Sequence, residues 1–186
     1  MRQLDSMVAT LRRARALDSL TPINGVRLAD ELYATGDDSS AYRELTSVLR
    51  RDPTNELVLA SLGPVLARRG DCRGGLAALP PPPDAGVGSM QFYVRTWGLC
   101  HQDARLRAFL QDGDRRARSG APTRPVVLGM AAAYLGDREA MYRWLGYAVD
   151  QGDWMLFYIN IYPEFVPFLK EPRFRALLQR LRMPTG

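Results

Sequence analysis

The sequence contains little of the chemistry that enzymes and metal sites use most often. Histidine occurs once, as His101, and cysteine occurs twice, as Cys72 and Cys100. A structural zinc site needs four ligands at a recognisable spacing, and the sequence shows neither that spacing nor a phosphate-binding glycine loop or nucleophile elbow. We therefore expect no catalytic residue, no metal site and no cofactor. His101 is expected to be a polar residue at a helix end.

Two cysteines are too few for a disulfide framework. They favour small, half-buried side chains, and a single bridge between them would require an oxidising compartment. Long hydrophobic runs are also missing, since no stretch of about 18 apolar residues occurs, and no transmembrane helix is predicted. The arginines at positions 12, 13 and 15 interrupt the N-terminal region, which does not resemble a signal peptide. We expect a cytoplasmic location; the alternative is periplasmic, as part of a membrane-anchored regulator.

Lysine is almost absent, because Lys170 is the sole lysine among 25 basic residues. The formal net charge is +5. The arginines occur as scattered pairs, such as Arg50-Arg51 and Arg115-Arg116, without interleaved aromatic residues. A GC-rich genome explains this bias more simply than selection for phosphate binding. We expect no direct contact with nucleic acid, and an arginine-rich nucleic-acid binder stays the weakest alternative.

The composition is typical of a folded protein, and the sequence has an internal period. Apolar residues make up 46% and charged residues 24% of 186 residues, which predicts one domain over residues 1–186. Gly-Asp pairs begin at positions 36, 70 and 136, so the separations are 70 − 36 = 34 and 136 − 70 = 66, close to twice 34. The missing break should fall near position 104, where the sequence reads HQDA from His101 to Ala104.

A period of 34 residues is the length of tetratricopeptide repeats, and the chain resembles them. In the first unit, Gly36-Asp37 is the expected turn between two helices and Pro53 ends the unit. We expect Asp37 and Asp38 to cap the second helix of this unit. The resemblance implies an all-α, right-handed α-solenoid of about four units, at residues 22–55, 56–89, 90–121 and 122–155.

The units differ in how closely they follow the pattern. The second helix of the second unit is expected to be short, because Pro80 to Pro83 cannot continue it, and Pro80 to Ser89 is expected to be an extended connection. The third unit is degenerate. A helix in residues 1–21 and a capping segment over residues 156–186, with a helix that begins at Pro172, are predicted to close the two ends of the array. The apolar stretch from Trp154 to Phe165 is expected to seal the fourth unit against that helix; the alternative is an exposed patch.

The C-terminal part is similar to the end of the tetratricopeptide modules found in bacterial winged-helix regulators, adenylate cyclases and Ser/Thr kinases. The matching residues follow the fourth unit: Pro163, Phe165, Pro167, Leu169, Pro172-Arg173-Phe174, Leu177-Leu178 and Arg180. Glu171 departs from the family, which usually has an aspartate there. The similarity implies an interaction or sensing module of a signalling or transcription-regulating protein.

In this repeat class the first helix of each unit lines a concave groove that binds partners. The corresponding positions that carry tyrosine, arginine, aspartate or methionine are Asp30, Tyr33, Arg68, Tyr93, Arg95, Met130 and Tyr134. The first hypothesis is therefore a non-enzymatic scaffold that binds a protein or peptide in this groove, as a monomer or an oligomer. The alternative is a small-molecule sensor with its ligand near the degenerate third unit, because departures from a repeat often mark function.

Overall fold

The computed structural model describes residues 2–82 and 89–183, with side chains from Ser6 onward. The described residues form α-helices and short 3-10 helices, and none of them lies in a β-strand, so the all-α prediction is confirmed. The elements are α1 (Arg2–Leu17), α2 (Pro22–Ala34), α3 (Asp38–Leu49), α4 (Glu56–Arg68), α5 (Cys72–Ala78), α6 (Met90–Leu99), α7 (Asp103–Ser119), α8 (Pro125–Tyr134), α9 (Arg138–Gln151), η1 (Trp154–Tyr158), η2 (Val166–Phe168) and α10 (Pro172–Arg180). Among the described helices, none combines the length and the apolar character needed to cross a bilayer.

The chain divides into two compact units, Met1–Pro82 and Pro83–Gly186. The division falls inside the proline run at positions 80–83, where the sequence predicts an extended connection. Leu79 has already left the helical region, with φ −66° and ψ 123°. Residues 83–88 of this predicted connection lie outside the described part of the chain.

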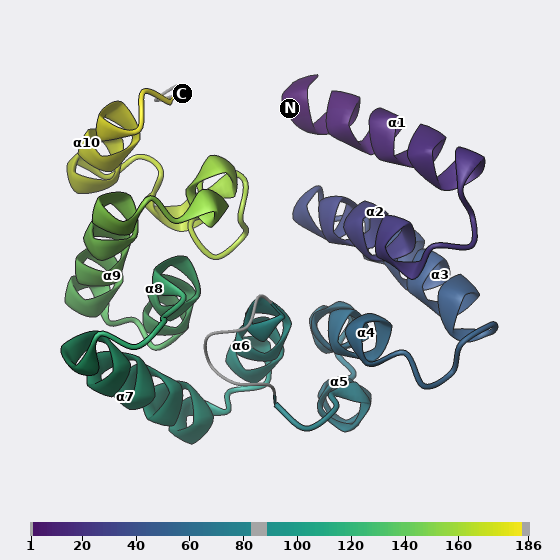
Figure 1. Cartoon of the computed structure of the whole chain (residues 1–186), viewed down its shortest axis with the longest axis horizontal. Helices are drawn as coiled ribbons and strands as arrows, with labels where there is room; N and C mark the ends of the chain where they lie inside the picture. Colours follow the sequence, from purple (N-terminus) through teal and green to yellow (C-terminus); the bar gives the residue numbers. More distant parts are fainter. Residues whose placement is uncertain (1, 83–88, 184–186) are drawn as a thin grey trace. The chain divides into compact units, whose positions relative to one another are not determined.

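In the first unit, consecutive helices pack as neighbours, and α2 also contacts α4 (Figure 1). The apolar side chains of α2 and α3 fill the space between them, and Ala41 and Leu45 are fully buried. Helix α5 has 7 residues, as the glycines and the prolines after it predict. Helix α1 contacts α2 and buries Val8, whereas Leu4 lies outside the residues whose side chains are described.

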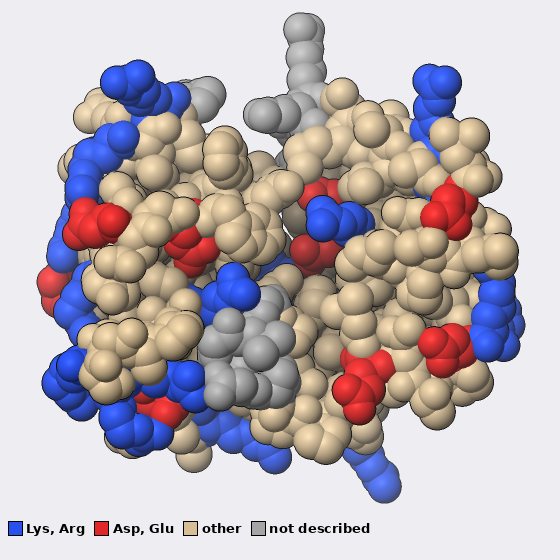
Figure 2. All heavy atoms as spheres, viewed as in Figure 1, with Lys and Arg blue, Asp and Glu red and all other residues tan. Residues whose placement is uncertain are grey.

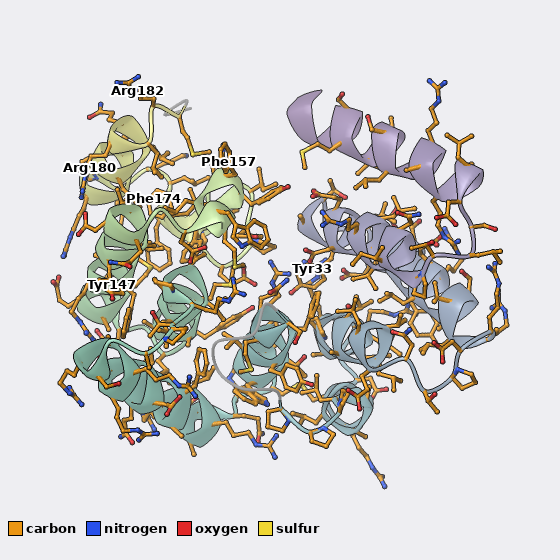
Figure 3. All side chains as sticks on the ribbon, in the orientation of Figure 1. Tyr33, Tyr147, Phe157, Phe174, Arg180 and Arg182 are labelled. Carbon is orange, nitrogen blue, oxygen red and sulfur yellow. The ribbon has the colours of Figure 1, made fainter. Side chains whose placement is uncertain are left out.

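In the second unit, α6 pairs with α7 and α8 pairs with α9, and α6 also contacts α8 (Figure 1). The chain then runs through η1 and η2 into α10, which begins at Pro172 as predicted. Phe165 and Phe174 are both fully buried, with ring centroids 6.1 Å apart, and so join the segment after α9 to α10. This part of the predicted seal is confirmed. Trp154 and Phe157, at the start of the same stretch, are 54% and 80% exposed, so this end of the stretch is not part of the predicted seal (Phe157 is labelled in Figure 3).

One backbone turn recurs after α2, α4, α6 and α8. The second residue of each turn donates its N–H to the carbonyl five positions earlier, and the residue before it has a positive φ. The four bonds are Asp37 to Leu32, Asp71 to Leu66, Gln102 to Trp97 and Asp137 to Ala132, at 2.8 to 3.0 Å. Glycine takes the left-handed position three times, and His101 takes it once, with φ 54°. The break predicted near position 104 is therefore a real helix end, built without glycine.

Aspartate is also the N-cap residue of the next helix at three of these turns. The Asp37 carboxylate accepts a hydrogen bond from the Ser40 N–H at 3.0 Å, and Asp71 and Asp137 act in the same way at α5 and α9. This bond is the largest cause of the lowered pKa of Asp37. The capping role predicted for Asp37 is confirmed. Asp38, predicted to share it, is the first residue of α3, and its carboxylate binds an arginine of α4 instead.

Candidate binding face on the first helices

The seven residues predicted to bind a partner lie on α2, α4, α6 and α8, the first helices of the four pairs. Four of them are buried: Tyr33, Tyr93, Arg95 and Met130, at 2%, 3%, 1% and 0% exposure. Asp30, Arg68 and Tyr134 are partly exposed. Their part in partner binding stays a prediction. Four of the seven residues, Tyr33, Arg68, Arg95 and Tyr134, belong to two polar clusters, one in each unit.

In the first unit, Arg68 of α4 binds Asp38 at the start of α3. Its Nε lies 2.8 Å from both carboxylate oxygens of Asp38, and Nη2 donates to one of these oxygens as well. The same Nη2 donates to the main-chain carbonyl of Tyr33 at 2.6 Å, and the guanidinium stacks 3.5 Å from the centroid of the Tyr33 ring. We call these three residues the Arg68–Asp38 cluster. It joins α2, α3 and α4 through one planar cation.

In the second unit, Arg95 of α6 binds Glu164, which lies in the segment between η1 and η2. Arg95 Nε donates to Glu164 Oε1 at 3.0 Å, and the two side chains are 1% and 0% exposed. The Tyr134 hydroxyl of α8 donates to the same oxygen at 3.1 Å. The Arg95 guanidinium also faces the Tyr162 ring, 5.1 Å from its centroid. We call these four residues the Arg95–Glu164 cluster.

A glycine of α6 holds Tyr134 in position. A Cβ atom placed on Gly98 would lie 2.2 Å from Cγ of Tyr134, too close for any side chain to be added without moving the ring. The Tyr134 ring therefore packs flat on the backbone of α6. This close approach brings the hydroxyl of α8 to the carboxylate that α6 already binds through Arg95.

One oxygen of this buried carboxylate has no hydrogen-bond donor among the described residues. Glu164 Oε1 accepts from Arg95 and Tyr134, whereas Oε2 is buried and has no partner in the part of the chain that the structure describes. A buried acceptor without a donor costs about 1 to 3 kcal/mol, and more for a charged group. The cluster thus carries a buried acceptor that costs stability.

Three members of these clusters, Asp38, Glu164 and Tyr162, were missed by the sequence reasoning, as was Gly98, the glycine under Tyr134. Asp38 had a signal, since a second acidic residue after the capping aspartate is more than a cap requires. Glu164 is 69 residues from Arg95, and no pattern of charge or period links them. Gly98 stands at an ordinary helical position, and only the aromatic ring of another helix explains it.

The polar groups of both clusters are suited to recognition by hydrogen bonding. Each combines a guanidinium, a carboxylate and a tyrosine, and neither contains a cysteine, serine or histidine. His101 lies in the turn after α6, as a helix-end residue, which is the role predicted for it. No group of three or more His, Cys, Asp or Glu side chains in the described part of the chain is arranged to hold a metal ion.

Comparisons of this chain with models of protein families, with curated proteins and with solved structures each found no match.

Proposed function

We propose that the chain is a tetratricopeptide-like interaction module that binds an extended segment of another protein along its first helices. In this proposal the helix pairs follow the right-handed solenoid pattern, and the binding face is formed by α2 and α4 in the first unit and by α6 and α8 in the second. Stacked helix pairs of this type generate extended concave binding surfaces. The C-terminal resemblance favours a role as the sensory part of a bacterial regulator.

The observation that carries this proposal is the recurrence of one helix–turn–helix geometry. The same backbone hydrogen bond closes the turn after α2, α4, α6 and α8, and at each of these turns an α-helix begins directly after the donor residue. The bond also ends α7, α9 and α10, so the immediate start of the next α-helix is what distinguishes the four pairs. Within each unit the two first helices are neighbours: α2 contacts α4, and α6 contacts α8. A chain that repeats both the turn and this neighbour relation presents equivalent residues of successive helices on the same side.

The partly exposed groups on these helices supply the anchors. Asp30 of α2 and Tyr134 of α8 are both partly exposed. Tyrosine and arginine are enriched among the residues that dominate binding energy, because they combine a large contact area with directed hydrogen bonds. An extended peptide has unpaired backbone N–H groups, and carboxylates on this face would accept hydrogen bonds from them.

A displayed library of random peptides, selected against the full chain, tests the proposal. Selected peptides should bind Tyr134→Phe and Asp30→Ala at least about fivefold more weakly than the original chain, since each change removes one anchoring group. Tyr147→Phe on α9 and Asp114→Ala on α7 are the matched controls on second helices. Selection of no peptide above background would contradict the proposal. Equal losses in the control variants would contradict the assignment to the first helices.

A second candidate function is supported by the unpartnered Glu164 Oε2. Glu164 binds Arg95, and Arg95 lies on the first helix of the degenerate third pair. This position favours a small ligand with an N–H donor. A thermal-shift screen of small amines and amides should then give a rise in Tm that Glu164→Gln abolishes. A screen in which no compound stabilises the chain, or in which Glu164→Gln responds equally, would rule this candidate out.

A further inference from the structure

An open groove of about 510 Å³ lies in the first unit, among α1, α2 and α3. Its floor includes Leu28 and Leu32, both 4% exposed. Three arginines line it: Arg12 and Arg15 from α1 and Arg43 from α3. An apolar floor with charged groups above it is the usual composition of a site that binds an organic ligand or a peptide side chain.

The three arginines are not equivalent. Arg15 is fixed by contacts within the unit, because it binds Glu44, the Ser19 carbonyl and the Ser47 hydroxyl. Arg43 is exposed, and its Nη2 donates to the Ser40 hydroxyl at 2.8 Å. Arg12 is also exposed, and the hydrogen bonds found among the described residues do not include its guanidinium. Two cations with donors to spare therefore flank the groove.

Arg12 and Arg43 lie near the same carboxylate at the start of α3, and the carboxylate of Glu44 in the groove lining is bound by Arg15. The pKa of Asp37 is lowered first by the N–H and hydroxyl of Ser40, and additionally by the charges of Arg43 and Arg12. The two arginines thus act together on a carboxylate at the same edge. Figure 2 shows basic and acidic side chains on one face of the molecule.

We propose that this groove, defined by Arg12, Arg15, Leu28, Leu32 and Arg43, is a docking site for an acidic amphipathic segment of a partner protein. Charge complementarity selects the acidic side chains, which Arg12 and Arg43 bind, and the leucine floor selects an apolar residue between them. The groove is open, with Arg12 and Arg43 exposed at its edge. A small metabolite site would bury most of its ligand, so the open shape favours a peptide. The site is separate from the face of the first helices proposed above.

The test uses the full chain and three fluorescent peptides of about 12 residues, measured by anisotropy. The first alternates pairs of glutamates with single leucines; the second has lysines in place of the glutamates; the third has serines in place of the leucines. Arg12→Ala and Arg43→Ala should each weaken binding of the first peptide by about three- to tenfold, and added salt should do the same. Arg13→Ala is the matched control, because Arg13 is an exposed arginine of α1 that does not line the groove.

The result expected is binding of the first peptide alone, weakened by the two groove variants and not by Arg13→Ala. Circular dichroism of the variants should be unchanged, since both arginines are exposed. Equal losses in Arg13→Ala, equal binding of the lysine or serine peptides, or no binding of the first peptide at about 1 mM would overturn the proposal. A single-stranded oligonucleotide that binds more tightly than the first peptide, and depends on Arg12 and Arg43, would also overturn it in favour of nucleic acid.

Discussion

Each unit contains an arginine bound by a carboxylate beside a tyrosine, but the two pairs differ in burial and in how completely the carboxylate is hydrogen-bonded. In the first unit, Arg68 satisfies both oxygens of Asp38, and the two side chains keep 23% and 19% of their exposure. In the second unit, Arg95 and Glu164 are almost completely removed from water, yet one carboxylate oxygen finds no donor in residues 2–82 and 89–183. The pair that is more costly to bury is thus the one that is less completely satisfied.

This difference separates a structural contact from a candidate for recognition. The bidentate Arg68–Asp38 pair uses most of its hydrogen-bonding capacity within the unit, as a pair that joins three helices should. A buried ion pair such as Arg95–Glu164 contributes little net stability, because desolvation offsets the attraction. The unsatisfied Oε2 adds a further cost. Features that cost stability without an evident compensating gain are often functional sites.

Among the variants that test this comparison, Arg95→Ala should lower the free energy of unfolding the most. Arg95→Ala leaves the Glu164 carboxylate buried without its cation, which should lower the free energy of unfolding by about 3 to 5 kcal/mol. Chemical unfolding followed by circular dichroism measures this loss. The double variant Arg95→Met with Glu164→Leu should recover most of it. A loss below about 1 kcal/mol for the single variant would show that the pair is not desolvated in solution.

Removal of Arg68 should cost less. Arg68→Ala loses a bidentate pair and a cation–π contact, but water can reach Asp38 afterwards, so we expect a loss of about 1 to 2 kcal/mol. The same unfolding measurement gives both values under one set of conditions. If Arg68→Ala proves as costly as Arg95→Ala, the contrast between an exposed and a buried cluster is not supported.

The Asp37 cap at the start of α3 should make a smaller, pH-dependent contribution to the free energy of unfolding. Asp37→Ala should cost about 1 kcal/mol at neutral pH. Because the pKa of Asp37 is lowered in the folded chain, its charge stabilises the fold above the unfolded pKa, about 4, and this contribution disappears as the pH falls through the folded value. Unfolding curves of Asp37→Ala and the original chain should therefore converge in acid. Curves that stay equally far apart at every pH would contradict an ionic cap.

The smallest effect is expected at the turn after α6. His101 has φ 54°, where the three corresponding residues are glycines. His101→Gly should raise the free energy of unfolding by about 0.5 kcal/mol, because relief of backbone strain slightly exceeds the entropy that glycine loses. Gly136→Ala, at φ 72°, is the opposite change and should destabilise by about 1 kcal/mol. A destabilised His101→Gly variant would show that the imidazole makes a compensating contact.

The helices could be predicted closely because their signals are local. Pro22 and Pro172 begin α2 and α10, and the Gly-Asp pairs mark three turns. Even the turn without glycine was found, since the period predicted a break where His101 stands. Each of these signals lies within a few residues of the feature it predicts.

The site could be predicted only in part, because its geometry depends on residues far apart in the sequence. Periodicity placed Arg68, Arg95 and Tyr134 on first helices, but it could not show that Arg68 and Arg95 bind carboxylates of their own chain. Burial was also missed: Tyr33 and Tyr93 were expected at a surface and are 2% and 3% exposed. Repeat position gives the direction of a side chain, whereas exposure depends on what packs over it.

The most direct test of the proposed binding face is hydrogen exchange of the full chain, measured by mass spectrometry with and without a peptide selected against it. We predict slower exchange in α2, α4, α6 and α8, and little change in α3, α7 and α9. Protection confined to the second helices, with α2, α4, α6 and α8 unchanged, would contradict the account.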